Sequence, residues 1–205
     1  MARVGANAEA RATTRRILEA AVRCIASTGA AAVSVQDVAA AAGVSKALVH
    51  YHFHDKDTLL ARLVEHLASG LVDRERNALA EYAGRHDPLA VDALWRWVEA
   101  ELQRGDMRVL LELDAYRGEA VQAAARHAAV LRRSAAAATI SRLLEILALR
   151  PRVAPELLAN VAVAFLDGLA IEAAVAGEDA SSPQSAGGAR VAFDVFWLAM
   201  LSLAE

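Results

Sequence analysis

The segment SKALVHYHFH, residues 45–54, gathers hydrogen-bond donors and contains no acidic residue. Lys46, His50, Tyr51 and His52 supply an ammonium group, two imidazoles and a phenol within one short stretch. Such groups suit the phosphate oxygens and base edges of nucleic acids. The residue types therefore predict a surface that binds a nucleic acid.

Two short helices and a tight turn are predicted to position these side chains. Ser34 is a good N-cap for the first helix, and Ser45 caps the second, which bears the donors. Gly43 lies between them and tolerates the positive φ angle that a tight helix–helix turn needs. Asp55 caps a third helix behind them. The arrangement is that of a helix-turn-helix, which presents its second helix to the major groove of DNA.

Apolar residues of this segment are expected to pack the helices together and leave the donors outside. The packing positions are Val38, Ala39, Val44, Leu48 and Val49. Lys56 opens the following helix, where its charge and the backbone N–H groups would both attract a phosphate. The predicted DNA-binding residues are Ser34, Gln36, Ser45, Lys46, Ala47, His50, Tyr51, His52 and Lys56.

The charge balance of the chain changes sign along its length. The 205 residues carry 22 Lys and Arg against 25 Asp and Glu, a formal net charge of -3. Residues 1–62 nevertheless hold eight basic and five acidic residues, so this part alone is net positive. A local positive surface lowers the free energy of approaching phosphates whatever the total charge. The distribution of charge therefore favours DNA binding at the N-terminal end.

The same segment resembles the DNA-binding signature of the TetR (tetracycline-repressor) family of bacterial regulators. The resemblance covers roughly residues 13–60 and has several residue types at fixed spacing. It lies in Ser34, Asp37-Val38-Ala39, Ala42-Gly43-Val44-Ser45, Tyr51-His52-Phe53, Lys56 and Leu59-Leu60. It implies that the residues that touch DNA include Ser34, Gln36, Lys46, Tyr51, His52 and Lys56.

Three residues depart from the family pattern. His50 stands where an aromatic residue is usual, Leu48 where Thr or another small residue is frequent, and Gln36 where Arg is common. We therefore expect the operator sequence to differ at the bases that these positions face. The resemblance also implies a homodimer on a palindromic operator, a small-molecule effector and, by default, repression of transcription.

The remainder of the chain is predicted to be helical, which gives an all-α fold. Ala, Leu, Arg and Glu dominate it, and runs of β-branched residues are absent. We expect about nine helices: three in an N-terminal helix-turn-helix domain, residues 1–55, and six in a ligand-binding and dimerisation domain, residues 56–205. The helix from Lys56 connects the two domains. Residues 177–188, GEDASSPQSAGG, are expected to form a flexible loop.

The middle helices are expected to enclose the effector, as the resemblance implies. An apolar pocket with one or two polar anchors would suit a small, largely apolar molecule. Trp95 and Trp97 are two residues apart, so at most one of them should face a central pocket. For each candidate residue, plain core packing is the alternative. The candidates are Trp95, Trp97, Met107, Leu110, Leu111, Asp114, Tyr116, Arg117, His127 and Phe165.

Two apolar stripes in the last two helices are predicted to pair the protomers, because a single helix-turn-helix reads only a short half-site. Two such helices from each protomer would form a four-helix bundle. The alternative is that both stripes belong to the core of one protomer. The predicted interface residues are Val161, Ala162, Leu166, Leu169, Ala170, Phe193, Phe196, Trp197 and Met200.

Other classes of protein fit the sequence less well. The enzyme motifs HExxH, GxGxxG, GxSxG and GxxxxGK do not occur in it. A helical bundle that binds small molecules or catalyses a reaction without DNA is the alternative, but it would not need the acid-poor helix at residues 45–53. His50 and His54 could chelate a metal only if that helix continued past Asp55, so no metal and no cofactor is expected.

The compartment is inferred from cysteine usage and hydropathy. The single cysteine, Cys24, cannot form an internal disulfide. We find neither a signal-peptide core nor a stretch of about 18 uncharged apolar residues. We therefore expect a cytoplasmic protein without a membrane span. Its expected partners are double-stranded operator DNA, an effector of unknown identity and a second copy of the chain.

Overall fold

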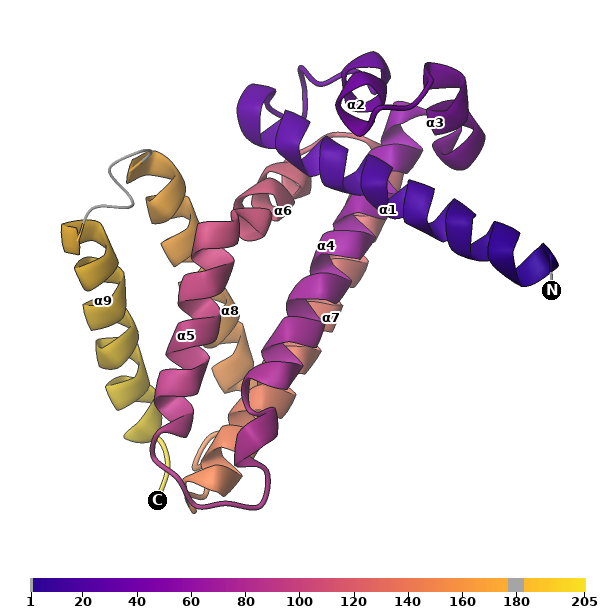
Figure 1. Ribbon diagram of the computed structural model, residues 1–205. Helices are drawn as coiled ribbons and strands as arrows, with labels where there is room; N and C mark the ends of the chain where they lie inside the picture. Colours follow the sequence, from indigo (N-terminus) through magenta and orange to yellow (C-terminus); the bar gives the residue numbers. More distant parts are fainter. Residues whose placement is uncertain (1, 177–182) are drawn as a thin grey trace. The chain divides into compact units, whose positions relative to one another are not determined.

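Helices make up almost all of the described chain. The computed structural model describes residues 2–176 and 183–205, with side chains described for residues 8–175 and 187–205. Within these ranges there are nine α-helices, one short 3-10 helix and no strand, which confirms the all-α prediction. Figure 1 shows their order along the chain.

The helices are α1 (Ala2–Thr28), α2 (Val35–Ala42), α3 (Lys46–Phe53), α4 (Lys56–Ala78), η1 (Ala80–Tyr82), α5 (Ala90–Arg104), α6 (Asp106–Asp114), α7 (Glu119–Ile146), α8 (Pro155–Ala176) and α9 (Pro183–Leu201). The structure confirms the three predicted helix starts: α2 begins after Ser34, α3 after Ser45 and α4 after Asp55. Of the predicted loop at residues 177–188, residues 183–188 belong to α9, which begins at Pro183. Proline suits the first position of a helix, where its missing N–H group has no partner to lose. Residues 177–182 lie outside the described residues.

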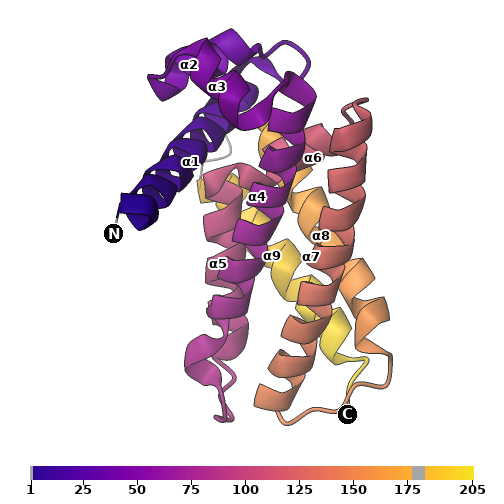
Figure 2. The same cartoon turned by 90° about the vertical axis from the view of Figure 1, so that its right-hand side faces the viewer.

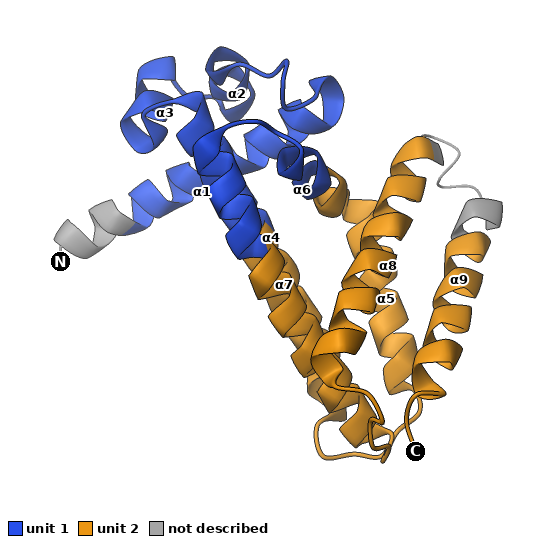
Figure 3. Cartoon of the chain, turned by 180° about the vertical axis from the view of Figure 1, so that it is seen from behind, with its two compact units in different colours: residues 1–67, 109–128 blue, residues 68–108, 129–205 orange. Residues whose placement is uncertain are grey.

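The chain divides into two compact units, which Figure 3 colours separately. The first unit is Met1–Leu67 with Val109–Ala128, and the second is Ala68–Arg108 with Ala129–Glu205. This division differs from a boundary between residues 55 and 56. Helices α4 and α7 are continuous and contribute residues to both units, and the segment 109–128 belongs to the helix-turn-helix unit.

The first unit buries one apolar face from each of α1, α3 and α4. Its largest fully buried side chains include Ile17, Ile25, Phe53, Leu59 and Leu63. Burying a side chain of this size contributes about 1.5–3 kcal/mol. Helices of eight residues, such as α2 and α3, are not stable alone in water. The packing of this core therefore holds the two short helices in place.

In the second unit, α8 packs against both α5 and α9. Figure 2 shows these helices beside the later turns of α7. One continuous core joins Leu94 of α5, Leu143 of α7, Ala159 of α8 and Phe193 of α9. Residues of four helices that are far apart in the sequence thus form one apolar interior.

Helix α8 is the most apolar long helix of the described chain. Its stretch Pro155–Val175 has a mean hydropathy of 1.7, so by length and composition alone it could cross a membrane. It is not an uncharged stretch, because Glu156, Asp167 and Glu172 lie within it. A core helix of a bundle meets the same description, and Ala159, Leu169 and Ala170 are buried in the second unit. Only 28% of this stretch is buried, so packing within that unit accounts for one face of α8 and leaves other apolar residues exposed.

Two buried charged residues of the second unit, Glu101 and Arg132, form ion pairs that join its helices. Arg74 of α4 donates from Nε to Oε1 of Glu101 at 2.5 Å and from Nη2 to Oε2 at 2.7 Å. The same Nη2 donates to Asp106 Oδ2 at 3.2 Å. The Glu101 side chain is 1% exposed, whereas Arg74 is 30% exposed. Arg132 of α7 is buried and pairs with Asp167 of α8. Each of these buried charges therefore has an oppositely charged partner.

Candidate DNA-binding surface and cavities

Side-chain caps hold the starts of α2 and α3. Ser34 Oγ accepts the Asp37 N–H at 3.2 Å, and the Asp37 carboxylate accepts the Ser34 N–H at 2.9 Å, which completes a capping box. Ser45 Oγ accepts the Leu48 N–H at 3.1 Å. Gly43 ends α2 with φ +64°, in the left-handed region that favours glycine. The capping box at Ser34 therefore fixes the start of α2, the left-handed backbone of Gly43 fixes its end, and the Ser45 cap fixes the start of α3.

The capping box changes what Ser34 can offer to DNA. Its hydroxyl donates to Asp37 Oδ2 at 2.6 Å and its N–H donates to the same oxygen. The hydrogen bond from the Ser34 hydroxyl lowers the pKa of Asp37, which keeps this acceptor ionised. Both donors of Ser34, a predicted DNA contact, are thus already used within the capping box.

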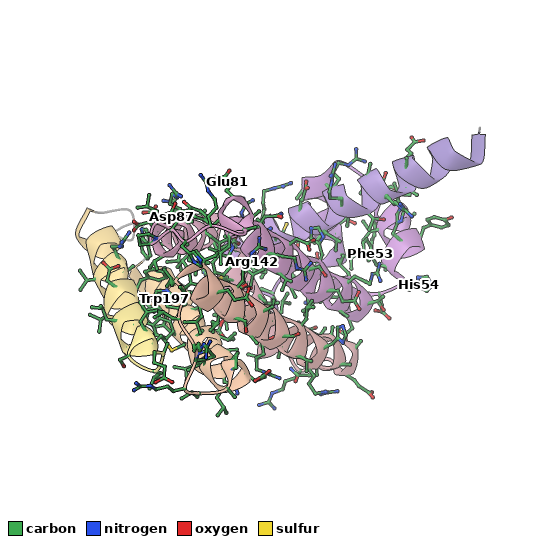
Figure 4. The ribbon with its side chains drawn as sticks, turned by 90° about the horizontal axis from the view of Figure 1, so that it is seen from below. Phe53, His54, Glu81, Asp87, Arg142 and Trp197 are labelled. Atoms are coloured by element: carbon green, nitrogen blue, oxygen red, sulfur yellow. The ribbon has the colours of Figure 1, made fainter. Side chains whose placement is uncertain are left out.

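The outer face of α3 carries the predicted donors. Its exposed residues are Lys46, Ala47, His50 and Tyr51, and the Tyr51 side chain is 77% exposed. On the opposite face Val49 and Phe53 are each 1% exposed. Figure 4 labels Phe53 and the exposed His54 at the end of this helix. The helix therefore separates a buried apolar face from an exposed face that carries no acid.

His52 lies differently from the prediction, which placed it on the outer surface. It is half-buried, and its Nδ1 lies 3.3 Å from Thr14 Oγ1 of α1. Its ring meets the Tyr51 ring edge to face, with centroids 5.4 Å apart. His52 follows the buried Val49 by three residues, which places it at the border of the buried face. It contacts α1 and supports the ring of Tyr51.

Helix α3 ends in a strained turn at His54. This residue has φ +63° and ψ -57°, and the Asp55 N–H donates to Phe53 O at 2.7 Å. These angles and this hydrogen bond define a γ-turn of the rare positive-φ form. The helix therefore stops where the Asp55 cap predicted. Among the described residues, no group of three His, Cys, Asp or Glu side chains is arranged to hold a metal ion.

Two further hydrogen bonds close the turn at His54. The His54 N–H donates to His50 O at 2.8 Å, and His50 Nδ1 lies 2.7 Å from His54 O. Because a carbonyl oxygen can only accept, the His50 ring must carry a proton on Nδ1. The other ring nitrogen, Nε2, is then the atom of His50 that a base edge can engage.

Lys56 has surroundings that the sequence did not indicate. Its Nζ donates to Ala31 O at 3.0 Å and lies 5.6 Å from the centroid of the Tyr116 ring. The Tyr116 hydroxyl donates to Asp57 Oδ1 at 3.2 Å. Gly118 is needed here, because a Cβ at that position would lie 2.7 Å from Asp57 Oδ2. The segment after α6 therefore holds the first turn of α4, and Lys56 can meet a phosphate only with its remaining N–H donors.

Each unit contains a hollow. The hollow of the first unit has a volume of about 500 Å³, and its wall is partly charged: Ala30, Ala31, Asp57, Glu112, Ala115, Tyr116, Arg117 and Gly118. The cavity of the second unit has a free volume of about 30 Å³ and a wall that is almost entirely apolar. Its lining residues are Glu75, Leu94, Trp97, Val98, Ala136, Thr139, Ile140, Ala162, Phe165, Leu166, Phe193, Phe196 and Trp197.

The structure separates the ten predicted effector residues. Trp97 and Phe165 line the apolar cavity, and Tyr116 and Arg117 line the charged hollow. The other six line neither of these two hollows: Trp95, Met107, Leu110, Leu111, Asp114 and His127. Four of these lie in the segment 109–128, which belongs to the first unit. Trp95 and Met107 are buried in the core.

Glu75 is a cavity residue that the sequence analysis missed. It lies three and four residues from Val72, Leu71 and Leu79, all of which are buried, so its carboxyl lies on the apolar face of α4. This spacing in the sequence could have identified Glu75 as a residue of the apolar face. The aromatic residues of α9 were also missed as cavity residues, because they had been assigned to the dimer interface.

Most residues of the predicted dimer interface lie inside the protomer. Six of its nine residues are buried inside the protomer: Ala162, Leu169, Ala170, Phe193, Trp197 and Met200. Leu166 and Phe196 are half-buried beside the cavity, and Val161 alone of the nine is more than half exposed. Because α8 and α9 are apolar on more than one face, residue spacing could not identify the outer one. The exposed apolar residues are Leu157, Val161, Ile171 and Val175 of α8, and Val191, Val195 and Leu198 of α9.

Glu75 should make folding stability depend on pH. Burial raises the pKa of Glu75 to about 7, against smaller lowering effects of the Thr139 hydrogen bond and of Arg132 and Arg76. The unfolded chain has a pKa of 4.5 at this residue, so the folded state holds the proton more tightly. The resulting stability is fully present below pH 4.5 and is lost as the pH rises through about 7. The difference corresponds to about 3 kcal/mol.

We therefore expect Glu75→Gln to be more stable than the wild type at pH 8, by as much as about 3 kcal/mol, and similar to it at pH 4.5. Urea unfolding at both pH values measures the difference. Glu145→Gln, at an exposed position of α7, is the matched control and should follow the wild type. The same pH dependence in the wild type and in Glu75→Gln would contradict the assignment.

Comparison with known proteins places the helix-turn-helix of this chain among those of bacterial regulators. A family model described as "Bacterial regulatory proteins, tetR family" matches residues 17–63, from α1 into α4. Over 107 residues the chain is 31% identical to the HTH-type transcriptional regulator AcrR of Shigella flexneri, a match that covers 51% of this chain. The match spans 49% of AcrR, so the chain matches about half the length of this curated relative.

Solved structures resemble the chain over nearly its full length. A TetR-family transcriptional regulator of Mesorhizobium loti, described as putative in its published name, matches 95% of this chain and 98% of its own, with a TM-score of 0.75 and 21% identity. The SmeT–triclosan complex matches 92% of this chain and 91% of its own, with a TM-score of 0.67 and 22% identity. At these identities the likeness concerns the fold.

Proposed function

Because the chain belongs to the TetR family of bacterial regulatory proteins, we propose that it is a DNA-binding transcriptional regulator and not an enzyme. The observation that carries the proposal is the outer face of α3, where Lys46, His50 and Tyr51 are exposed and no acid is present. A capped helix with one buried face can offer such donors to the major groove at a fixed angle. A helical bundle without DNA binding would have no use for this face.

The regulator acts as a homodimer on a palindromic operator. Two copies of α3 must be spaced to reach successive half-sites, and a two-fold dimer provides that spacing. The exposed apolar residues of α8 and α9 support pairing through these helices, because isolated proteins rarely expose so many apolar side chains on two neighbouring helices.

A small, largely apolar effector releases the regulator from DNA. The apolar cavity of the second unit supports an effector of this kind, and SmeT has been solved with triclosan. Helix α4 runs without a break from one unit to the other, so a shift of its later turns displaces its first turn, next to α3. Without effector the protein represses transcription, and it does so in the cytoplasm, where the DNA is.

Lys46→Ala tests the DNA-binding face. We expect operator binding to weaken and the slope of log affinity against log salt to fall by about one unit, because one phosphate contact is lost. Lys46 is exposed, so the melting temperature should not change. Anisotropy titrations with a genomic fragment that the wild type retains, at several salt concentrations, measure the slope.

Arg133→Ala, at an exposed position of α7 in the second unit, is the matched control for the loss of one positive charge. It should leave the slope unchanged. If the wild type retains no genomic fragment at all, the proposed function fails. An unchanged slope in Lys46→Ala would remove this residue from the interface.

A further inference from the structure

We propose that the apolar cavity of the second unit binds a neutral, flat aromatic molecule that carries a hydrogen-bond acceptor, such as a ketone or ester carbonyl. That this molecule is the effector rests on the proposed function, whereas its binding does not. The donors, the rings and the charges of the cavity wall each favour such a ligand.

Two indole N–H groups of the wall have no acceptor. Trp97 and Trp197 both line the cavity, their Nε1 atoms are buried, and neither donates to any acceptor in the described part of the chain. Trp197, labelled in Figure 4, is 7% exposed. An unpaired buried donor costs about 1–3 kcal/mol relative to a paired one. Because an indole N–H can only donate, these two groups select ligands with an acceptor.

Aromatic rings form one side of the cavity. The rings of Phe165 and Phe196 are stacked, with centroids 4.3 Å apart and an interplanar angle of 4°. Phe196 meets Trp197 edge to face at 5.6 Å. Aromatic pairs of these geometries contribute about 0.5–1.5 kcal/mol beyond the area that they bury. If these rings move apart, a flat aromatic ligand can form equivalent ring–ring contacts with them, whereas a branched aliphatic molecule cannot.

The wall has one fixed and one adjustable side. The free volume of about 30 Å³ holds no more than a water or two, so an aromatic ligand requires side chains to move. Trp97, Phe165 and Phe196 are half-buried and can turn outward, whereas Phe193 and Trp197 are buried in the core. The ligand is therefore expected to take a place beside the Phe165–Phe196 stack and to accept from the indoles.

The charges of the wall favour a neutral ligand. Glu75 is the ionisable side chain among the residues that line the cavity, and burial raises the pKa of Glu75 to about 7. A carboxyl that is half protonated near neutral pH holds a cation weakly. Arg132 is already paired with Asp167, and Arg76 with Asp73, so neither is free to hold an anion.

Three probes of matched shape test the proposal. In 2-isopropenylnaphthalene a CH₂ group replaces the carbonyl oxygen of 2-acetylnaphthalene, and N-methylquinolinium is a flat cation. We expect equilibrium dialysis to show that the wild-type protein, without DNA, binds the ketone about ten-fold more tightly than the alkene, the difference of about one hydrogen bond. Equal binding of ketone and alkene, binding of neither, or tighter binding of the cation would each overturn the proposal.

Variants locate the hydrogen bond. Trp97→Phe and Trp197→Phe keep an aromatic ring and remove the N–H, so one or both should lose the preference for the ketone while alkene binding changes little. Trp95→Phe is the matched control, because Trp95 is buried but does not line the cavity, and it should retain the preference. A preference that survives in both Trp97→Phe and Trp197→Phe would overturn the assignment to the indoles.

Release from DNA is measured separately. If the ketone binds with the expected preference but does not weaken operator binding, the cavity assignment stands and the effector role in the proposed function fails. If other compounds release the operator and the ketone does not bind, the proposed function stands and the ligand assignment fails.

Discussion

Arg74→Ala is expected to destabilise the protein by about 3–5 kcal/mol, because it leaves a buried carboxylate without its partner. Glu101 is 1% exposed, and Arg74 neutralises it through two hydrogen bonds of 2.5 and 2.7 Å in a bidentate arrangement. Bidentate guanidinium–carboxylate pairs are the stronger kind of ion pair. Removing the guanidinium abolishes both hydrogen bonds and the charge compensation of a carboxylate that is almost fully buried.

Urea unfolding of Arg74→Ala measures this effect, and the same helix provides its control. Arg76 pairs with Asp73 at 3.5 Å with both side chains about two thirds exposed, so Arg76→Ala should cost no more than about 0.5 kcal/mol. A double variant, Arg74→Leu with Glu101→Leu, should recover most of the lost stability, because it removes both charges together. A loss below about 1 kcal/mol in Arg74→Ala would show that Glu101 is solvated or neutral.

If the protein pairs through α8 and α9 as proposed, Leu198→Glu is expected to convert the dimer into a monomer and to weaken operator binding by about 10²-fold or more, because each half-site would then be bound alone. Leu198 of α9 is 70% exposed, so the substitution removes no core contact within the protomer. A pair of glutamates facing each other across a two-fold axis would also repel. Folding should therefore be retained while pairing is lost.

Sedimentation velocity of the wild type and the variant measures the assembly, and anisotropy with the operator measures the affinity. Val130→Glu, on α7, is the matched control, because Val130 is exposed by 59% and lies outside the proposed interface helices. A Leu198→Glu protein that remains dimeric would place the interface elsewhere. A wild type that is monomeric at micromolar concentration would remove the dimer from the proposed function.

The helix-turn-helix was predictable because its signals are local. Ser34, Gly43 and Ser45 lie within twelve residues, and each specifies a cap or a turn through its own chemistry and that of its neighbours. The outward face of α3 follows from residue spacing once Val49 and Phe53 are placed in the core. His52 lies at the border of the two faces, so spacing alone could not decide its side.

The placement of the predicted effector residues was less predictable because it depends on contacts between residues far apart in the sequence. The segment 109–128 joins the first unit where Glu112 accepts the Ala30 N–H and Tyr116 donates to Asp57. The two residues of these pairs are 82 and 59 positions apart in the sequence, so no local sequence pattern predicts the contacts. The buried and exposed faces of α8 and α9 could not be told apart for another reason. Each of these helices carries apolar residues on more than one face.

The turn at His54 determines how motion reaches the recognition surface. Two residues, His54 and Asp55, separate α3 from α4, and a longer connection would absorb a displacement through small changes of many torsion angles. Here one residue is already at an extreme of its backbone range, and hydrogen bonds to His50 and Phe53 brace it. Such a short, hydrogen-bonded connection can absorb little displacement through its torsion angles, so a shift of the first turn of α4, as the proposed function requires, would also move α3. A small displacement in α4 would then take α3 out of register with a half-site.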